Sequence, residues 1–415
     1  MRRGAAAALA AVGLLAVAAA LAPAARASVE EFSTFTIAPQ EQDDESVLDH
    51  FLTRLPRAWR DEWARTSGGF RTSQGCLTSG QWFLDTDFKA RAPLGERAWL
   101  GVDLFQSESD ILDVQNLDLS FHFPQVVGSA FAMYRPNSNK AAQDFALGWE
   151  TGADTSGFQL RATWTIEDIF NRFAGFRQTQ VGDRVEPYER RPYEPALALA
   201  VRRPAWQAEV GAKWLTPSRK RVEDLGSNPL FFRELWGAAG HAWIERRWDA
   251  FALEARSEVR QARGAERPVA VGFTETVDYR RQWSVEGGAR MRVPGPRSQL
   301  EARCLYQSRT EFAGPPVGAA YLQVDDRLLN LEWTRGFGAS VQTRLGGLYE
   351  RVGVGRANPV RSSFGTRSES RLYVGLELRL GRVRVAGIEG VELDDEPYDV
   401  RIVHDKGFLQ LQTAF

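Results

Sequence analysis

The residues best placed to do chemistry are ionisable side chains that recur at every second position along many short segments. A period of two places such side chains on one face of a β-strand. The candidates lean acidic early in the chain and basic late in it. They are Asp85, Asp87, Asp103, Asp118, His122, Asp144, Arg161, Glu286, Arg290, Arg292, Arg344, Arg371, Glu377 and Arg379. Facing a common water-filled lumen, an acidic arc and a basic arc would create a transverse field; alternatively, the opposite charges pair across neighbouring strands.

Hydrolytic chemistry would need a nucleophile with a general base within reach. The chain has four histidines, at positions 50, 122, 241 and 404. A serine two residues after a histidine would share its face of a strand and could act as the nucleophile. His122 is followed by Phe-Pro and His241 by Ala-Trp, so neither histidine has such a serine. His404 precedes Asp405, but this pair lies in an expected loop. The sequence therefore predicts that the protein is not an enzyme.

Motifs that hold metals or cofactors are a separate class of candidate site. No His/Cys cluster has zinc spacing, and neither a P-loop nor a GxGxxG motif occurs. The acidic stretch 392–399 offers oxygen ligands of the kind that Ca²⁺ uses, or it is simply a solvated loop. Cys76 and Cys304 are far apart in the sequence, and we expect both to be free thiols. The sequence predicts neither a cofactor nor a bound metal.

The elements that position the ionisable residues are β-strands, because the period of two holds from about residue 81 onward. Leu372, Val374 and Leu376, for example, alternate with Arg371 and Tyr373. Many segments exceed the ~5–6 residues usual for globular strands and reach the ~9–11 that cross a bilayer at a tilt. Strands are expected near 81–90, 96–106, 114–123, 126–135, 142–151, 157–166, 194–203, 205–215, 237–247, 249–261, 267–279, 282–293, 297–309, 320–334, 337–350, 368–379, 382–391 and 407–415. This count gives roughly 16–18 strands, within the range of closed transmembrane barrels.

The connections between these strands test the count, because short turns and long loops should alternate between the two ends of a barrel. Counted back from the C-terminus, the connections alternate as expected as far as residue 297. The long stretches 167–193 and 216–236 then fall at the end of the short turns. We therefore expect one strand between 230 and 261 to be miscounted.

Aromatic residues near the strand ends point to a lipid environment. Trp206 and Trp214 share a face and are separated by about 26 Å at ~3.3 Å per residue, or roughly 20 Å along the membrane normal after a tilt of ~40°. That separation is close to the ~25 Å apolar band between aromatic girdles. The predicted girdle residues are Trp149, Trp164, Trp206, Trp214, Trp283, Trp333 and Phe415.

The N-terminal part does not alternate. Residues 1–27 have a basic start, an Ala/Leu/Val run and Ala25-Arg26-Ala27, which predicts an export signal cleaved after Ala27. Residues 28–80 predict two short helices that meet at Pro56, as a periplasmic extension or as a plug inside the barrel domain 81–415. Thr165 to Asp168 fits a helix capping box at the start of loop 167–193, which either folds into the lumen or lies on the surface. A formal net charge of −1 argues against binding of nucleic acid.

The last nine residues carry an apolar row, Leu409, Leu411, Thr413 and Phe415, and stop on an aromatic. This end resembles the closing strand of a bacterial outer-membrane β-barrel of the porin-like kind. The resemblance implies an all-β fold, a transmembrane antiparallel up-and-down β-barrel with a short, partly helical N-terminal extension. It implies location in the outer membrane of a Gram-negative cell, contact with lipopolysaccharide, and recognition of the strand ending at Phe415 by the barrel-assembly machinery; it leaves a homo-oligomer open.

The function that the resemblance implies is passive diffusion of small polar solutes. A non-conducting scaffold or adhesin-type barrel is the alternative, and an outer-membrane enzyme is a more remote one.

Overall fold

A computed structural model describes residues 68–76, 82–95, 98–109, 113–125, 128–135, 144–151, 157–166, 184–185, 187–224, 227–269, 274–295, 297–314, 320–357, 362–393 and 406–414. Every regular element in this part of the chain is a β-strand. The strands are β1 (Gly69–Cys76), β2 (Trp82–Pro93), β3 (Trp99–Ser109), β4 (Asp113–Pro124), β5 (Ser129–Arg135), β6 (Asp144–Glu150), β7 (Phe158–Ile166), β8 (Arg184–Val185), β9 (Tyr188–Arg190), β10 (Tyr193–Arg203), β11 (Trp206–Asp224), β12 (Pro229–Arg247), β13 (Phe251–Pro268), β14 (Thr276–Arg292), β15 (Gln299–Gly314), β16 (Ala320–Phe337), β17 (Val341–Ala357), β18 (Ser362–Leu380), β19 (Val383–Glu392) and β20 (Lys406–Ala414).

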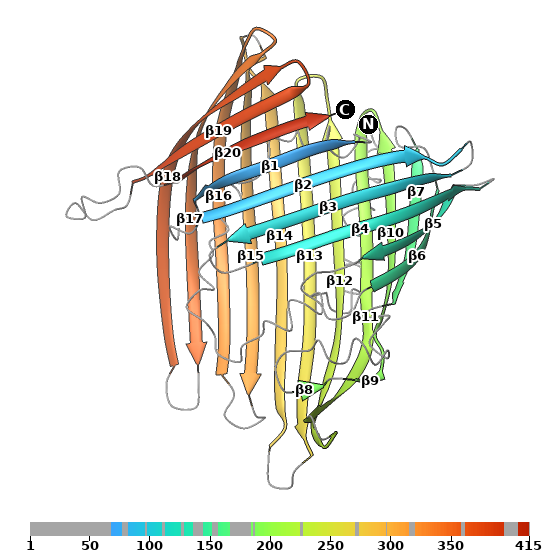
Figure 1. Cartoon of the computed structure of the whole chain (residues 1–415). Coiled ribbons are helices and arrows are strands. Elements are labelled where there is room, and N and C mark those ends of the chain that lie inside the picture. Colours follow the sequence, from blue (N-terminus) through green and yellow to red (C-terminus); the bar gives the residue numbers. More distant parts are fainter. Residues whose placement is uncertain are drawn as a thin grey trace, which may run out of the picture.

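The strands form one closed antiparallel sheet (Figure 1). β1 pairs with β2 on one side and with β20 on the other, so Gly69 lies opposite both Lys89 and Ala414. β7 pairs directly with β10, while the short β8 and β9 lie against the far end of β11. The wall is therefore an 18-strand barrel, as the alternation predicted. Toward the short-turn end each wall strand pairs with a neighbour on both sides, which a structure in lipid requires. Residues 362–369 of β18, toward the opposite end, pair with β17 alone among the described strands.

The two ends of the barrel differ. β1 to β7 have 7–12 residues each, and β11 to β18 have 16–19. In Figure 1, β1 to β6 cross the wall near the end where both described chain ends lie, and the long strands extend toward the opposite end. Tight turns join the strands at the first end; Gly338 and Gly381 adopt φ values of +67° and +64°, which favour glycine, at two of them. Longer connections lie at the opposite end.

The strand count is confirmed, but two of the individual assignments are wrong. Residues 69–76, assigned to the N-terminal extension, form β1 and close the barrel. The strand expected at 267–279 does not exist, because Arg267 and Pro268 end β13 and β14 runs unbroken from Thr276 to Arg292. The miscount thus lies at 267–279 and not between 230 and 261. With it corrected, the connection that follows β7 moves to the long-loop end. The stretch 216–236, expected as a long connection, is instead mostly strand, because β11 extends to Asp224 and β12 begins at Pro229.

Both errors have a physical cause. β1 has the sequence GFRTSQGC, whose outward row, Phe70, Thr72 and Gln74, gives almost no apolar signal. β13 and β14 are longer than the ~9–11 residues that a bilayer requires. An expected strand length set by bilayer thickness therefore divides these two strands into three. The predicted helices at residues 28–67 and 167–183 lie outside the described residues.

The two faces of the wall have opposite character. On β18, Leu372, Val374 and Leu376 are exposed by 51%, 58% and 46%, whereas Arg371 and Tyr373 between them are exposed by 1% and 4%. In water such an arrangement would forfeit the free energy of apolar burial, about 25 cal/mol for each Å² left wet. Lipid tails remove that cost. The alternation predicted from sequence is therefore confirmed, with apolar residues outside and ionisable residues inside.

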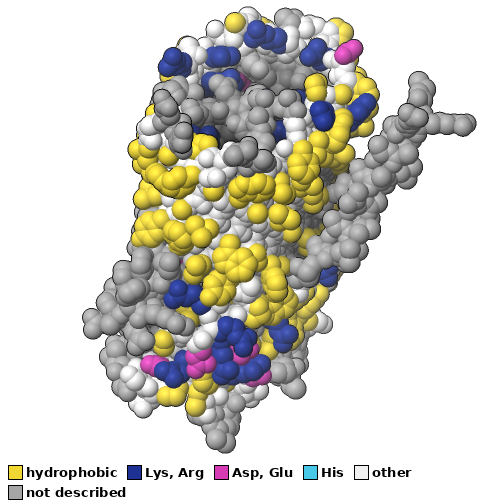
Figure 2. All heavy atoms as spheres, turned by 90° about the vertical axis from the view of Figure 1, so that its right-hand side faces the viewer, with side chains coloured by type: hydrophobic (Ala, Val, Ile, Leu, Met, Phe, Trp, Pro, Cys, Tyr) yellow, Lys and Arg dark blue, Asp and Glu magenta, His cyan; other side chains and the backbone are white. Residues whose placement is uncertain are grey.

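The outer surface carries hydrophobic side chains in a broad band (Figure 2). Beyond the band, at the long-loop end, basic and acidic side chains gather on the outside. There the Arg219 Nε atom lies 3.1 Å from Glu189 Oε2, and the Arg267 Nη2 atom lies 3.5 Å from Glu234 Oε2. Cys304 is a free, exposed thiol on β15. Among the described residues, no helix is long and apolar enough to span a bilayer.

Candidate functional site

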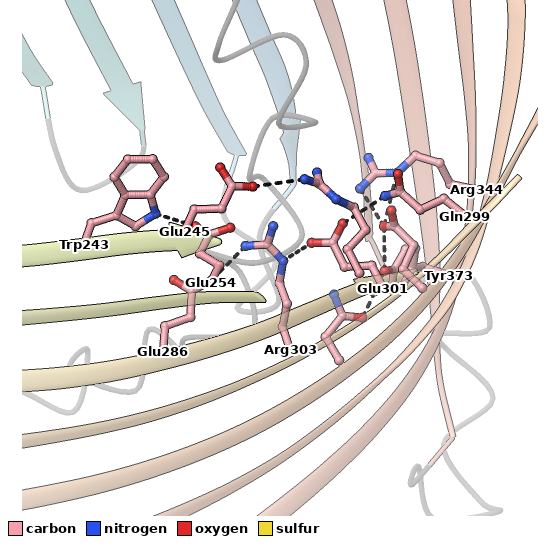
Figure 3. Close-up of polar contacts among 12 residues, drawn as sticks. Trp243, Glu245, Glu254, Glu286, Gln299, Glu301, Arg303, Arg344 and Tyr373 are labelled. Atoms are coloured by element: carbon pink, nitrogen blue, oxygen red, sulfur yellow. Dashed lines mark hydrogen bonds and ion pairs between the residues drawn. The ribbon is translucent and has the colours of Figure 1, made fainter. Parts of the chain in front are cut away.

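The inner face of β12 to β18 carries a network of charged side chains, set a few residues in from the short-turn end (Figure 3). Its residues come from successive strands because inward positions recur with a period of two and neighbouring strands are in register. The members are Trp243, Glu245, Glu254, Glu286, Arg290, Gln299, Glu301, Arg303, Asn330, Glu332, Arg344 and Tyr373. We call this set the inner charge network.

Arg303 on β15 lies at the centre of the network. Its Nη1 atom donates to Glu286 Oε1 at 2.8 Å, and its Nε atom donates to Glu301. Glu301 in turn lies directly opposite Glu332 of β16, so two carboxylates face each other across the strands. Arg303 is 9% exposed and Glu286 is 10% exposed in their side chains. The forked guanidinium thus holds together acids that would otherwise repel one another.

A second cation-to-carboxylate junction forms around Glu245 of β12. The carboxylate is completely buried and accepts from Arg290 Nη2 at 3.1 Å, while Arg247 Nη2 lies 2.6 Å from its other oxygen. Trp243, two residues earlier and on the same face, donates its indole N–H to Glu254 at 2.9 Å. The buried carboxylate of Glu245 is therefore matched by two arginines, as a group removed from water requires.

The third junction joins Glu332, Arg344 and Tyr373. Arg344 Nη2 lies 2.6 Å from Glu332 Oε2. The Tyr373 hydroxyl donates to the same oxygen at 2.9 Å and lies 3.1 Å from Asn330 Oδ1. The Tyr373 ring reaches this position by lying over Gly346, where an added Cβ would overlap the ring.

Gly346→Ala is therefore expected to destabilise the barrel by about 1–3 kcal/mol, the usual cost of overpacking. The methyl group would push Tyr373 away from Glu332. The neighbouring Gly347 provides a matched control, because a Cβ there meets only Leu372 Cδ2 at 3.5 Å, an ordinary contact. The folded fraction of each variant can be measured from its heat-modifiable gel mobility across a urea series in lipid vesicles. Equal midpoints for the two variants would contradict the packing argument.

The inner face of β11 to β13 is more accessible than the network. Arg256 and Arg260 on β13 are 43% and 45% exposed in their side chains, against 11% for Arg344. Across the neighbouring strands, His241 Nε2 lies 3.0 Å from Glu209 Oε1. The charged groups on this part of the wall are therefore accessible to water.

A stack of rings and cations crosses the wall on the opposite arc. The Trp99 and His122 rings stack with centroids 3.4 Å apart, and His122 lies 5.2 Å from the Phe131 ring. Arg91 lies over Trp99 at 4.7 Å and Arg161 over Phe131 at 5.0 Å. His122 is thereby packed between rings on the wall. Sequence reasoning missed this stack, although inward aromatics on successive strands gave a signal for it.

The candidate residues chosen from sequence lie on the inward rows of their strands. Asp87 accepts from Arg71 Nε at 2.7 Å, Arg371 Nε donates to Glu369 at 2.8 Å, and Arg384 lies 3.9 Å from Glu377. The remaining candidates on these rows are Asp103, Asp118, His122, Asp144, Arg161, Glu286, Arg290, Arg292, Arg344 and Arg379. The backbone of Asp85 in β2 pairs with Ser73 of β1, and the Asp85 side chain lies outside the described part of the structure. On the basic arc, Arg344, Arg371 and Arg384 are joined to carboxylates of the same or adjacent strands, as the pairing alternative predicted for them.

The predicted girdle residues fall at two levels of the outer face. Trp206 begins β11, while Trp149 and Trp333 lie near the ends of β6 and β16, all at the short-turn end. Trp164, Trp214 and Trp283 lie further along their strands, toward the long-loop end. Trp283 packs against Tyr306 with ring centroids 4.9 Å apart. Phe415 lies outside the described residues.

On the described strands, no group of three or more His, Cys, Asp and Glu side chains is arranged to hold a metal ion. Residues 394–399, the main part of the acidic stretch considered for Ca²⁺, lie outside the described residues.

Comparisons with known proteins find similarity in structure alone. No protein-family model matches the chain, and no curated protein matches it. The loop L8 deletion mutant of OmpT, an outer membrane protein of Vibrio cholerae, is similar over 84% of this chain and 97% of its own, with a TM-score of 0.37 and 12% identity. OccK11 of Pseudomonas aeruginosa is similar over 84% and 96%, with a TM-score of 0.40 and 12% identity. CdiB from Acinetobacter baumannii is similar over 84% and 60%, with a TM-score of 0.44 and 10% identity.

The architectural class follows from the barrel itself. The wall is closed by β1 and β20, its outer face is apolar over a band with aromatics at two levels, and its inner face is ionised. These are the defining features of barrels that cross the outer membrane. The chain thus has the architecture of a bacterial outer-membrane β-barrel.

Proposed function

We propose that the protein is a passive diffusion pore for small polar solutes in the outer membrane. The observation that carries the proposal is the accessible, charged inner face of β11 to β13 within a closed wall. A lumen that served only as packing would place apolar or fully paired side chains there. Exposed guanidinium and carboxylate groups instead favour water, and water is the medium through which small solutes diffuse.

The described interior also favours weak, reversible binding of passing solutes. Charges of both signs line β11 to β13, including Glu209, His241, Glu258 and Arg260. Ion pairs that are partly exposed to water contribute only about 0–1 kcal/mol each, so a passing solute can exchange with them at little cost. Such weak contacts suit permeation better than tight capture. The proposal includes no catalytic step.

A planar-bilayer recording tests the pore directly. Purified protein folded in detergent should insert and give discrete, ohmic conductance steps in KCl. The same preparation boiled before addition, which unfolds the barrel, serves as the control and should give none. Folded protein that inserts, as shown by protease protection and heat-modifiable mobility, yet gives no conductance would overturn the pore.

The second candidate is a barrel that does not conduct, with a structural or adhesive role. It is favoured by the packing on the inner face of β16 to β19, where Leu322, Leu328, Tyr373 and Ile388 are all buried. These residues show that part of the interior is filled. The recording separates the two candidates, because only a pore carries current.

A further inference from the structure

The inward-facing ionisable groups divide sharply by sign when they are ordered by exposure. Among the described residues, the ionisable side chains that are both inward-facing and exposed are six arginines and one acid. They are Arg91, Asp103, Arg161, Arg256, Arg260, Arg292 and Arg379. The carboxylates of the inner charge network are instead buried or half-buried. The wall therefore presents mainly positive charge to the lumen, although the chain as a whole is close to neutral.

Side-chain length explains the division. A guanidinium ends a long flexible stem and reaches away from the wall, whereas a carboxylate stays near the backbone. Glu245 and Glu286 are covered by the arginines that pair with them. Pairing thus neutralises the network while leaving other arginines to face the water. A solute in the lumen meets the outermost charges first.

The clearest instance is the row Arg256, Glu258 and Arg260 on β13. Arg260 donates to Glu258 Oε1 from Nε at 3.1 Å and from Nη2 at 2.9 Å, and Arg256 Nη2 lies 3.8 Å from Glu258 Oε2. Two cations thus share one acid, and the acid is the least exposed of the three, at 30%. The two arginines are about 13 Å apart along the strand at ~3.3 Å per residue. This row carries a net positive charge on the accessible part of the wall.

We propose that the pore selects small anions, and that Arg256 and Arg260 form the part of the wall that selects them. The inference rests on the proposed pore and adds its solute class. Oxyanions, with carboxylate or phosphate groups, are the class that fits best, because a guanidinium fork offers them two parallel hydrogen bonds. Chloride is attracted by the same positive charge but cannot form the two parallel hydrogen bonds.

The test is the reversal potential in a KCl gradient across a planar bilayer. The unmodified protein is expected to favour chloride over potassium. The double variant Arg256→Gln/Arg260→Gln should lower the chloride-to-potassium permeability ratio by about threefold for each charge removed, the effect of a unit charge several ångströms away in water. Arg263→Gln is the matched control, because Arg263 lies on the same strand, is exposed and faces outward. It should leave the ratio unchanged.

A second pair of variants tests the oxyanion preference. Inorganic phosphate added at fixed chloride should reduce the chloride current of the unmodified protein. Arg256→Lys/Arg260→Lys keeps the charge and loses the fork, so it should keep the chloride preference and lose most of the phosphate effect.

Several results would overturn the inference. One is a pore that is cation-selective or unselective, another is a glutamine variant that matches the control, and a third is phosphate block that persists in the lysine variant. Channels with any of these properties would leave the pore intact. Failure to conduct at all would remove the pore, and the anion preference with it.

Discussion

Replacing Arg303 by alanine is expected to destabilise the barrel by about 3–5 kcal/mol, the cost of removing one partner from a buried ion pair. The substitution leaves Glu286 and Glu301 without the guanidinium that binds both. Glu301 then faces Glu332 across the strands with less compensating charge. Three acids at close range in a poorly hydrated part of the wall either repel one another or take up protons, and both outcomes reduce stability at neutral pH.

The measurement is the urea midpoint of the folded fraction in lipid vesicles, followed by heat-modifiable gel mobility. Arg303→Lys retains the charge without the fork and should fall between alanine and the unmodified protein. Arg263→Ala removes an exposed, outward-facing arginine and should shift the free energy of unfolding by less than about 1 kcal/mol. If Arg303→Ala also lowered the free energy of unfolding by less than about 1 kcal/mol, water would have to screen the ion pairs of Arg303 with Glu286 and Glu301.

Much of the fold could be predicted because every strand of a membrane barrel alternates outward apolar residues with inward polar ones. Leu372, Val374 and Leu376 had to face one way and Arg371 and Tyr373 the other, and the structure confirms this. The rule fails where its signal is weak. β1 has only Phe70 as a large apolar residue. Main-chain pairing with β20 holds β1 in place, and this pairing requires no particular side chain.

The candidate site was only partly predictable, for a different reason. Alternation within one strand shows which residues share the inner face, but not which residues of neighbouring strands lie opposite each other. Arg303 lies opposite Asn330 and Gly288, while its partners Glu286 and Glu301 are one step away along the row. The register between neighbouring strands therefore determines which inward residues form ion pairs. Glu286 was among the predicted residues and Arg303 was not, although both lie on inward rows.

Exposure of the inner wall was not predictable at all. The sequence shows nearly equal numbers of acidic and basic residues, which by themselves indicate no sign for the charge that the inner wall presents. The structure shows that Glu245 and Glu332 are buried by their partners, whereas Arg256 and Arg260 remain exposed. Accessible charge depends on side-chain reach and pairing, and neither quantity is contained in a formal charge count.

Leu376→Arg is expected to cost about 2–4 kcal/mol, because it places a charge near the middle of the lipid-facing band. Leu376 is the central member of the outward row from Leu372 to Leu380. Val285 and Ser284 on β14 give a matched pair in which adjacent residues face opposite sides. Val285→Arg should cost a similar amount, while Ser284→Arg enters the lumen opposite Glu258 and should change stability by no more than about 0.5 kcal/mol. Urea midpoints in vesicles measure all three, and equal losses at positions 284 and 285 would show that the two faces of the wall do not separate lipid from water.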